Sequence, residues 1–136
     1  MRLRPVCLKV WRIYAVCSER GDCELLDFLG GLEGQLEKNA GRMRDLLNRV
    51  AESGPLRNTE ISHDLDKSKG IWEFIQGDLR VLWFYDEGKL IICSHGIVKK
   101  QRRTPRSEID RACRTFDAYT DAKARRQLLF EREEEE

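Results

Sequence analysis

The stretch that decides the fold runs from residue 71 to residue 94 and reads IWEFIQGDLRVLWFYDEGKLIICS. Three apolar segments rich in β-branched and aromatic residues are separated by short polar connections that contain glycine. Such connections are typical of β-hairpins, so we predict three consecutive strands. These strands are 71–75, 79–85 and 90–94.

Arg80 is the only charged residue in the middle predicted strand. Because side chains alternate along a strand, Arg80 shares one face with Leu82 and Phe84. A lone charge within an apolar strand makes Arg80 a candidate functional residue.

Helical periodicity dominates the region before these strands. Apolar residues recur at steps of three, four and seven, which indicates amphipathic helices at about 23–30 and 33–52, broken at Gly30-Gly31. Gly54 and Pro55 end the second helix, since glycine suits a C-terminal cap and proline cannot continue it. The residues that carry the period are Leu25, Phe28, Leu29, Leu32, Leu36, Met43, Leu47 and Val50.

The remaining segments complete an α+β domain. Residues 6–17 read as one strand, and the polar segment 58–69 reads as a loop. Thr104 is the predicted N-cap of a last helix, with Pro105 in its first turn, because apolar residues then repeat at helical spacing as far as Tyr119. We expect a small, mostly antiparallel twisted sheet, with an N-terminal helical hairpin on one face and a C-terminal helix.

Length and composition favour one cytoplasmic domain. We expect a single domain over residues 1–130 of the 136, followed by a disordered acidic tail at 131–136. The longest apolar runs, 13–17 and 81–85, fall far short of the roughly 20 residues that a membrane helix needs. Charged residues near the start interrupt any signal-peptide core, so we do not expect secretion.

The cysteines indicate reduced thiols. There are five, an odd number, and none forms a Cys-x-x-Cys pair, so neither a disulfide framework nor a zinc site is predicted. Cys93 and His95 could share a strand face, but only His63 remains as a second histidine. We therefore expect no metal and no other cofactor.

Charge is unevenly distributed along the chain. The net charge is +1, but the tail holds five of the 24 acids and one of the 25 bases, which leaves a net charge of +5 on residues 1–130. Between residues 99 and 114, seven bases face two acids. Such a cluster favours a polyanionic partner, although a solvated helix face beside a basic loop would have the same composition.

Two segments carry a resemblance to a known family. The first runs from Gly70 through Trp72-Glu73 to Tyr85, and the second reads His-Gly-Ile-Val-Lys-Lys-Gln-Arg-Arg-Thr-Pro at 95–105. Their order and spacing resemble the RelE/HigB-like toxins, in the phage-derived, host-inhibition-type branch of the RelE/ParE superfamily. The resemblance covers about residues 6–120 and implies a RelE-like fold.

The resemblance also implies a function. Proteins of this kind are toxins of type II toxin-antitoxin systems that cleave mRNA on the ribosome. We therefore expect a ribosome-dependent endoribonuclease without a metal. The expected partners are the ribosome, mRNA and a cognate antitoxin with a helix-turn-helix fold, and we expect no direct DNA binding and no membrane.

The residue types in the two segments suit RNA cleavage. Attack of a 2′-hydroxyl on the neighbouring phosphate needs a base, an acid and cations that stabilise the charge on phosphorus. Arg80 is the first choice for clamping the phosphate, because a guanidinium makes forked contacts with phosphate oxygens. The catalytic candidates are Arg80, Lys99, Lys100, Glu73 and His95, and the RNA-binding candidates are Lys67, Lys69, Arg102, Arg103 and Arg106.

Each candidate also has a structural interpretation. Arg80 and Glu73 could be an ion pair between neighbouring strands, and His95 could be a core histidine. The family often has a basic residue where this chain has Ile75-Gln76, and the first tyrosine of the last helix is Tyr119, three turns into it. A non-catalytic RNA- or protein-binding module with the same fold is therefore the alternative.

Overall fold

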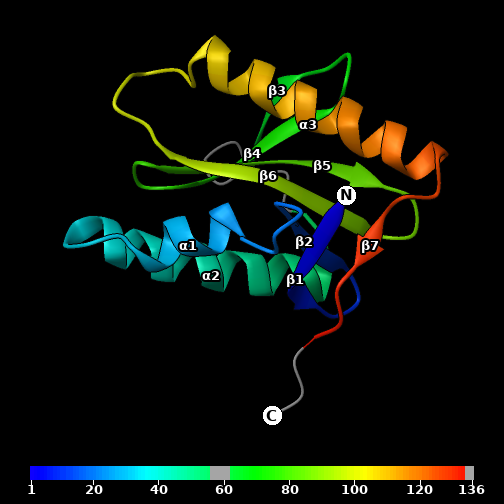
Figure 1. The fold of residues 1–136 in the computed structure, drawn as a ribbon. Helices are drawn as coiled ribbons and strands as arrows, with labels where there is room; N and C mark the ends of the chain where they lie inside the picture. Colours follow the sequence, from blue (N-terminus) through cyan, green and yellow to red (C-terminus); the bar gives the residue numbers. More distant parts are fainter. Residues whose placement is uncertain (56–61, 134–136) are drawn as a thin grey trace.

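A computed structural model describes residues 1–55 and 62–133, with only the backbone described at residues 62 and 63. It confirms the α+β class, with three helices and one seven-stranded mixed sheet (Figure 1). In chain order the elements are β1 Arg2–Leu8, β2 Arg12–Cys17, α1 Glu24–Gly30, α2 Gln35–Ser53, β3 Ser62–Asp66, β4 Ile71–Gln76, β5 Leu79–Asp86, β6 Leu90–Val98, α3 Arg106–Ala124 and β7 Leu129–Phe130.

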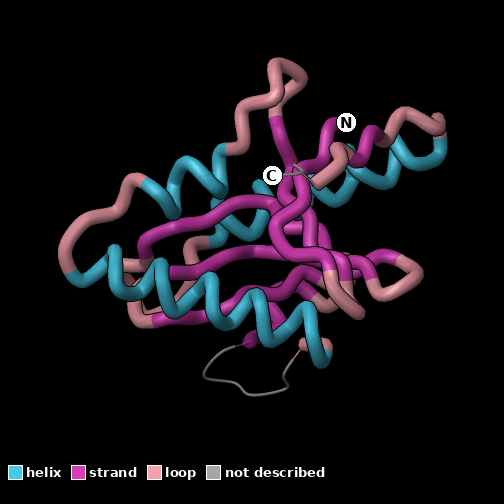
Figure 2. The backbone as a smooth tube through the Cα atoms, turned by 90° about the horizontal axis from the view of Figure 1, so that it is seen from below, coloured by secondary structure: helices cyan, strands magenta, loops and turns pink. Residues whose placement is uncertain are grey.

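The strands lie in the order β3-β4-β5-β6-β2-β1-β7. Neighbours from β3 to β6 pair antiparallel, as do β1 and β2, whereas β2 with β6 and β1 with β7 pair parallel. The parallel β2–β6 pair joins the N-terminal hairpin to the strands from residues 62–98, and the same sheet is seen from below in Figure 2.

The prediction of one strand over residues 6–17 is wrong. The chain turns at residues 9–11, where the Lys9 amide donates to the Trp11 carbonyl and the Trp11 amide donates to Ala51 at the end of α2. β1 and β2 then pair with each other, Arg4 opposite Ala15. The turn holds Lys9, Val10 and Trp11, which include none of the usual turn residues, so the sequence did not reveal it.

The predicted loop at 58–69 is also wrong in part. Residues 62–66 form β3, an edge strand paired antiparallel with β4, and residues 67–70 form the turn between them. The register shifts between Asp64 and Asp66, and this irregularity removes the alternation by which a strand is recognised. The first part of the predicted loop, residues 58–61, lies outside the described residues.

Helices cover both faces of the sheet, as Figure 1 shows. α1 and α2 pack on the face that carries Phe74, Val81 and Trp83. α3 packs on the opposite face against Leu82 and Phe84. Residues 79–84 of β5 are consequently all buried, Arg80 included. Among the described helices, none combines the length and the apolar character needed to cross a membrane.

The start of α3 differs from the prediction. Pro105 is the N-cap residue and makes no side-chain capping bond, while the hydroxyl of Thr104 donates to Glu73 on β4 instead. The predicted Thr104 cap is therefore wrong. Proline suits the N-cap because its φ of −58° leads into a helix and it has no amide hydrogen to satisfy.

Candidate functional site

The sheet register brings three of the predicted catalytic residues onto the face beneath α3. Glu73 on β4 and His95 on β6 both lie opposite Leu82 of β5, one on each side. Arg80 lies two residues from Leu82 and therefore shares its face. A register shift between Leu82 and Trp83 makes Ser94 the extra residue of a bulge next to His95.

Arg80 is buried and held by the protein itself. Its Nη1 donates to the carbonyl oxygens of Gly77 at 2.7 Å and Leu79 at 2.9 Å. Its Nε lies 3.6 Å from Oε1 of Glu73, and the two side chains are only 10% and 3% exposed. Burial lowers the pKa of Arg80, against the opposing effect of the Glu73 charge. These contacts favour the structural interpretation, in which Arg80 supports Glu73.

Glu73 also fixes the loop that connects β6 to α3. The Thr104 hydroxyl donates to Glu73 Oε1 at 2.5 Å, and both residues are buried. At the other end of this loop the Lys99 amide donates to the Asp78 carbonyl at 2.7 Å. The loop at residues 99–105 is thus anchored to the sheet at both ends, which limits where its basic side chains can lie.

A hollow of about 360 Å³ lies between this loop and the edge of the sheet; we call it the basic hollow. Three of its lining residues are cations, Lys99, Arg102 and Arg103, and none of them forms an ion pair with another described residue. The nearby carboxylate of Glu73 faces Arg80. Lys100 is exposed beside the hollow. The surplus of positive charge suits an anion such as a phosphate. Its lining residues are Asp64, Leu65, Glu73, Lys99, Arg102, Arg103, Thr104 and Ile109.

His95 does not line the basic hollow. It is fully buried beneath α3, with Nδ1 2.9 Å from Ser94 Oγ and Nε2 3.5 Å from Glu108 Oε2. Burial lowers the pKa of His95, and the charge of Arg111 lowers it further, although Glu108 opposes both effects. A neutral, buried imidazole is placed to hold α3 on the sheet.

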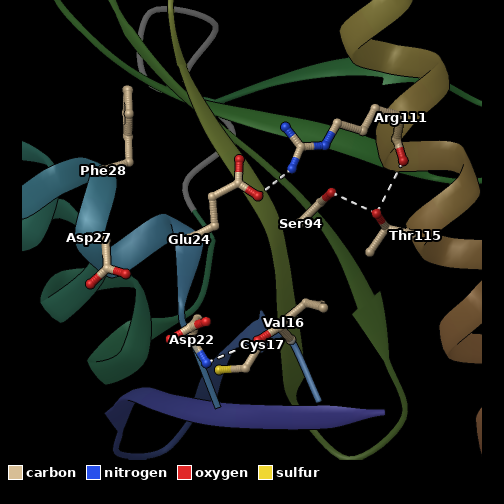
Figure 3. A pocket seen from close by; sticks show the side chains of 10 residues that line it. Val16, Cys17, Asp22, Glu24, Asp27, Phe28, Ser94, Arg111 and Thr115 are labelled. Carbon is tan, nitrogen blue, oxygen red and sulfur yellow. Dashed lines mark hydrogen bonds and ion pairs between the residues drawn. The ribbon is translucent and has the colours of Figure 1, made fainter. Parts of the chain in front are cut away.

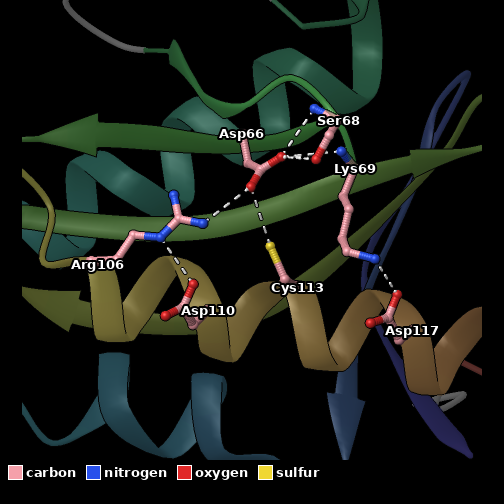
Figure 4. Close-up of polar contacts among 7 residues, drawn as sticks. All are labelled: Asp66, Ser68, Lys69, Arg106, Asp110, Cys113 and Asp117. Atoms are coloured by element: carbon pink, nitrogen blue, oxygen red, sulfur yellow. Dashed lines mark hydrogen bonds and ion pairs between the residues drawn. The ribbon is translucent and has the colours of Figure 1, made fainter.

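Of the other predicted RNA-binding residues, one is exposed and two form ion pairs within the protein. Lys67 is exposed in the β3–β4 turn. Lys69 reaches α3, with Nζ 2.7 Å from Asp117 Oδ1 and 5.9 Å from the ring centre of Phe116. Arg106, at the start of α3, has Nε 3.0 Å from Asp110 Oδ1 and Nη2 3.7 Å from Asp66 Oδ2 (Figure 4).

Asp66 was not among the predicted site residues. Its Oδ1 accepts hydrogen bonds from the Ser68 amide at 3.0 Å, the Ser68 hydroxyl at 2.7 Å and the Lys69 amide at 3.1 Å (Figure 4). These bonds, the Ser68 hydroxyl first, lower the pKa of Asp66. The sequence Asp66-Lys-Ser-Lys-Gly70 is typical of a turn in which an aspartate accepts from the backbone, and could have been recognised.

A second and larger hollow lies between α1 and α3 (Figure 3). This α1–α3 hollow has a volume of about 790 Å³, and the Glu24–Arg111 ion pair, 2.5 Å from Oε2 to Nη2, spans it. Sequence reasoning missed it because its residues come from four separate segments. They are Val16, Cys17, Ser18, Asp22, Glu24, Asp27, Phe28, Ser94, Arg111 and Thr115.

The fold and the basic hollow define a small α+β domain in which the β6–α3 loop and the start of α3 frame a cationic site. The model of the phage-derived Gp49-like proteins (DUF891) matches residues 28–117, and the chain belongs to this family. The family is associated with RelE- and toxin-like proteins. No curated protein matches the sequence. The matched residues include the end of α1, all of α2, the basic hollow and most of α3.

Proposed function

We propose that this chain is the toxin of a type II toxin-antitoxin system and cleaves mRNA on the ribosome. The observation that carries the proposal is the basic hollow, in which Lys99, Arg102 and Arg103 gather beside the carboxylates of Glu73 and Asp64. The Gp49-like family, compatible with a toxin-like module, adds support.

The basic hollow offers the groups that RNA cleavage requires. Lys99, Arg102 and Arg103 would bind the scissile phosphate and its neighbours and stabilise the charge that develops on phosphorus. Glu73 is our choice for the general base, because Thr104 and Arg80 fix the position of its carboxylate. The 2′-hydroxyl would lose its proton to Glu73 and attack the adjacent phosphorus. The bond from phosphorus to the 5′-oxygen would break, and that oxygen would take a proton from water, which leaves a 2′,3′-cyclic phosphate and a free 5′-hydroxyl. None of these steps uses a metal.

Arg80 and His95 have supporting roles in this proposal. Arg80 would hold Glu73 in place, since two backbone carbonyls already occupy its Nη1. His95 would keep α3 on the sheet through Ser94 and Glu108. The remaining cations, Lys67, Lys69, Lys100 and Arg106, would contact ribosomal RNA or the message, where phosphate contacts position the protein without reading sequence.

The partners follow from the resemblance to RelE/HigB-like toxins. The ribosome and mRNA would be the targets, and a helix-turn-helix antitoxin would neutralise the toxin. Co-expression with the protein of the neighbouring gene tests this arrangement. We expect the two proteins to copurify, and purification of this chain as a lone monomer beside the expressed neighbour would contradict it.

The central experiment combines growth and cleavage. We expect induced expression to arrest bacterial growth and to shorten translated messages, and purified protein to cut mRNA on programmed ribosomes. The test variant is Lys99→Gln, Arg102→Gln and Arg103→Gln together. Its matched control is Arg42→Gln, Arg44→Gln and Arg49→Gln, which removes the same charge from exposed positions of α2.

Loss of cleavage in the basic-hollow variant but not in the α2 variant would support the proposal. Equal loss in both would show that only overall charge matters. Intact messages with the unaltered protein, at confirmed soluble expression, would contradict the toxin activity itself.

A non-catalytic binding module is the second candidate function. It is favoured by the burial of Arg80, Glu73 and His95, each of which already has partners within the protein. In that case the basic hollow would bind RNA or an acidic protein without cutting. Retained binding to a translated message that stays intact would select this alternative.

A further inference from the structure

Three of the five cysteines gather in the core beneath the α1–α3 hollow. Cys17 ends β2, Cys23 directly precedes α1 and Cys93 lies in β6. Cys17 and Cys23 are close enough for their thiols to interact, as are Cys23 and Cys93, and the Cys17 thiol donates to the Ala15 carbonyl at 3.8 Å. All five cysteines are free.

A tight turn holds Cys17 and Cys23 together. The Ser18 amide donates to the Asp22 carbonyl at 2.9 Å, and the Gly21 amide donates to the Ser18 carbonyl at 2.9 Å. The Asp22 amide also donates to the Ser18 hydroxyl at 3.0 Å. Gly21 has a φ of 91°, which favours glycine. The turn folds the chain back so that Cys23 lies beside Cys17.

The two thiols differ in access. Cys17 lines the α1–α3 hollow (Figure 3) and is 7% exposed, whereas Cys23 is 1% exposed and does not line it. A small oxidant that enters the hollow therefore meets Cys17 first. The buried Cys23 thiol is less accessible and lies beside Cys17.

Arg4 places a positive charge near both sulfurs. Its guanidinium donates to the Gly21 carbonyl of the turn and interacts with the charges of Cys17 and Cys23. A thiolate is the reactive form of cysteine, and a nearby cation stabilises it. Arg4 thus favours the thiolate of Cys17, whose pKa burial raises.

We propose that Cys17 and Cys23 are a dithiol site that a hydroperoxide oxidises to a reversible disulfide. The Cys17 thiolate attacks the terminal peroxide oxygen, the O–O bond breaks and Cys17 becomes a sulfenic acid, with hydroxide or an alkoxide as the leaving group, which then takes a proton from water. The Cys23 sulfur then attacks the Cys17 sulfur, the S–O bond breaks, and the Cys23 proton leaves with the oxygen as water.

The bond would tie the end of β2 to the start of α1, two elements that wall the α1–α3 hollow. Burial raises the pKa of Cys17 to about 11, so few molecules hold the thiolate at neutral pH. The rate should therefore rise with pH from 7 to 10, because the thiolate is the nucleophile.

Peptide mapping of the full chain tests the proposal. The protein is treated with hydrogen peroxide, its remaining thiols are alkylated, and trypsin then cleaves after Arg20, between the two cysteines. We expect peptide 13–20 linked to peptide 21–38, lighter than the reduced pair by the mass of two hydrogen atoms. Dithiothreitol should release both peptides.

Two other results would overturn the proposal. Linkage of peptide 21–38 to peptide 90–99 would show that Cys23 pairs with Cys93 instead. Alkylation of both Cys17 and Cys23 after excess peroxide at pH 9 would show that the site does not oxidise.

The variant Cys23→Ser tests which thiol reacts first. In this variant Cys17 should stay as a sulfenic acid that dimedone traps, and absence of that adduct would contradict Cys17 as the first thiol.

The contribution of Arg4 has a matched control. Arg2 and Arg4 both pair with Glu131, but only Arg4 interacts with the two thiols. We expect Arg4→Gln to slow disulfide formation several-fold and Arg2→Gln to leave the rate unchanged. Equal rates in the two variants would contradict the role of Arg4.

Discussion

Arg80 and Arg102 carry the same guanidinium within one neighbourhood of the fold, but in opposite surroundings. Arg80 lies between the sheet and α3, where backbone carbonyls and Glu73 occupy it. Arg102 lies on the exposed loop at 99–105, and among the described residues no carboxylate pairs with it. A buried charge must be satisfied by the protein, whereas an exposed one is free for a ligand. Chemical type alone does not distinguish the two.

The largest effect on stability is expected when the buried arginine, Arg80, is replaced. Arg80→Ala removes the guanidinium that faces the buried carboxylate of Glu73, so we expect the free energy of unfolding to fall by about 3–5 kcal/mol. The matched variant Arg102→Ala should change it by less than about 0.5 kcal/mol. Urea titrations of both variants measure the difference. Unchanged stability of Arg80→Ala together with lost cleavage would show that Arg80 clamps the phosphate.

A smaller loss is expected at Thr104. Thr104→Val removes the hydroxyl that donates to buried Glu73 and keeps the shape of the side chain. We expect a loss of about 1–3 kcal/mol, because Glu73 loses a hydrogen bond that water cannot fully replace. Thermal unfolding beside Thr115→Val, whose hydroxyl is only partly buried, provides the comparison. Equal effects at both positions would contradict the importance of the Glu73 contact.

The pH dependence of stability tests His95, which is buried on the same face of the sheet as Arg80. Burial lowers the pKa of His95 below its ordinary value of 6.5, so the unfolded chain binds a proton that the folded protein does not. Stability from this group is complete above pH 6.5 and is lost as pH falls below it. Free energies of unfolding at pH 7.5 and 5.5 should show this fall, and His95→Gln should reduce it. An equal fall in the variant would assign the effect to other groups.

The smallest effect on stability is expected in the basic hollow. Combined replacement of Lys99, Arg102 and Arg103 by glutamine should leave the melting temperature nearly unchanged, since their side chains make no ion pair with another described residue. If all three contact phosphates, the salt dependence of binding to single-stranded RNA should fall by about 2 in log–log slope. An unchanged slope would show that RNA does not bind in the basic hollow.

The sequence predicted the elements whose pattern is local. The strands at 71–75, 79–85 and 90–94 are found as β4, β5 and β6, because glycine-containing turns separate continuous apolar runs. The turn at residues 9–11 and the strand β3 were missed, since one has no turn residue and the other is an irregular edge strand. The turn is fixed by a distant contact, from the Trp11 amide to Ala51, whereas β3 pairs with the next strand, β4.

The candidate site was predictable only in part. The basic residues around position 100 could be found from charge, and the structure places Lys99, Arg102 and Arg103 in one hollow. The burial of His95 could not be found, because it follows from the packing of α3. Thr104 looked like a helix cap, and only the tertiary fold shows that its hydroxyl is used by Glu73.

The parallel pairing of β2 with β6 bears on how the protein is synthesised. Residues 12–15 pair with residues 90–93, so the N-terminal hairpin has no neighbour on that side until most of the chain has left the ribosome. Contacts this distant in sequence slow folding. The loop at 99–105 follows β6 directly, so the basic hollow can form only after this late strand has joined the sheet. A nascent chain shorter than about 100 residues would therefore lack the cationic site altogether.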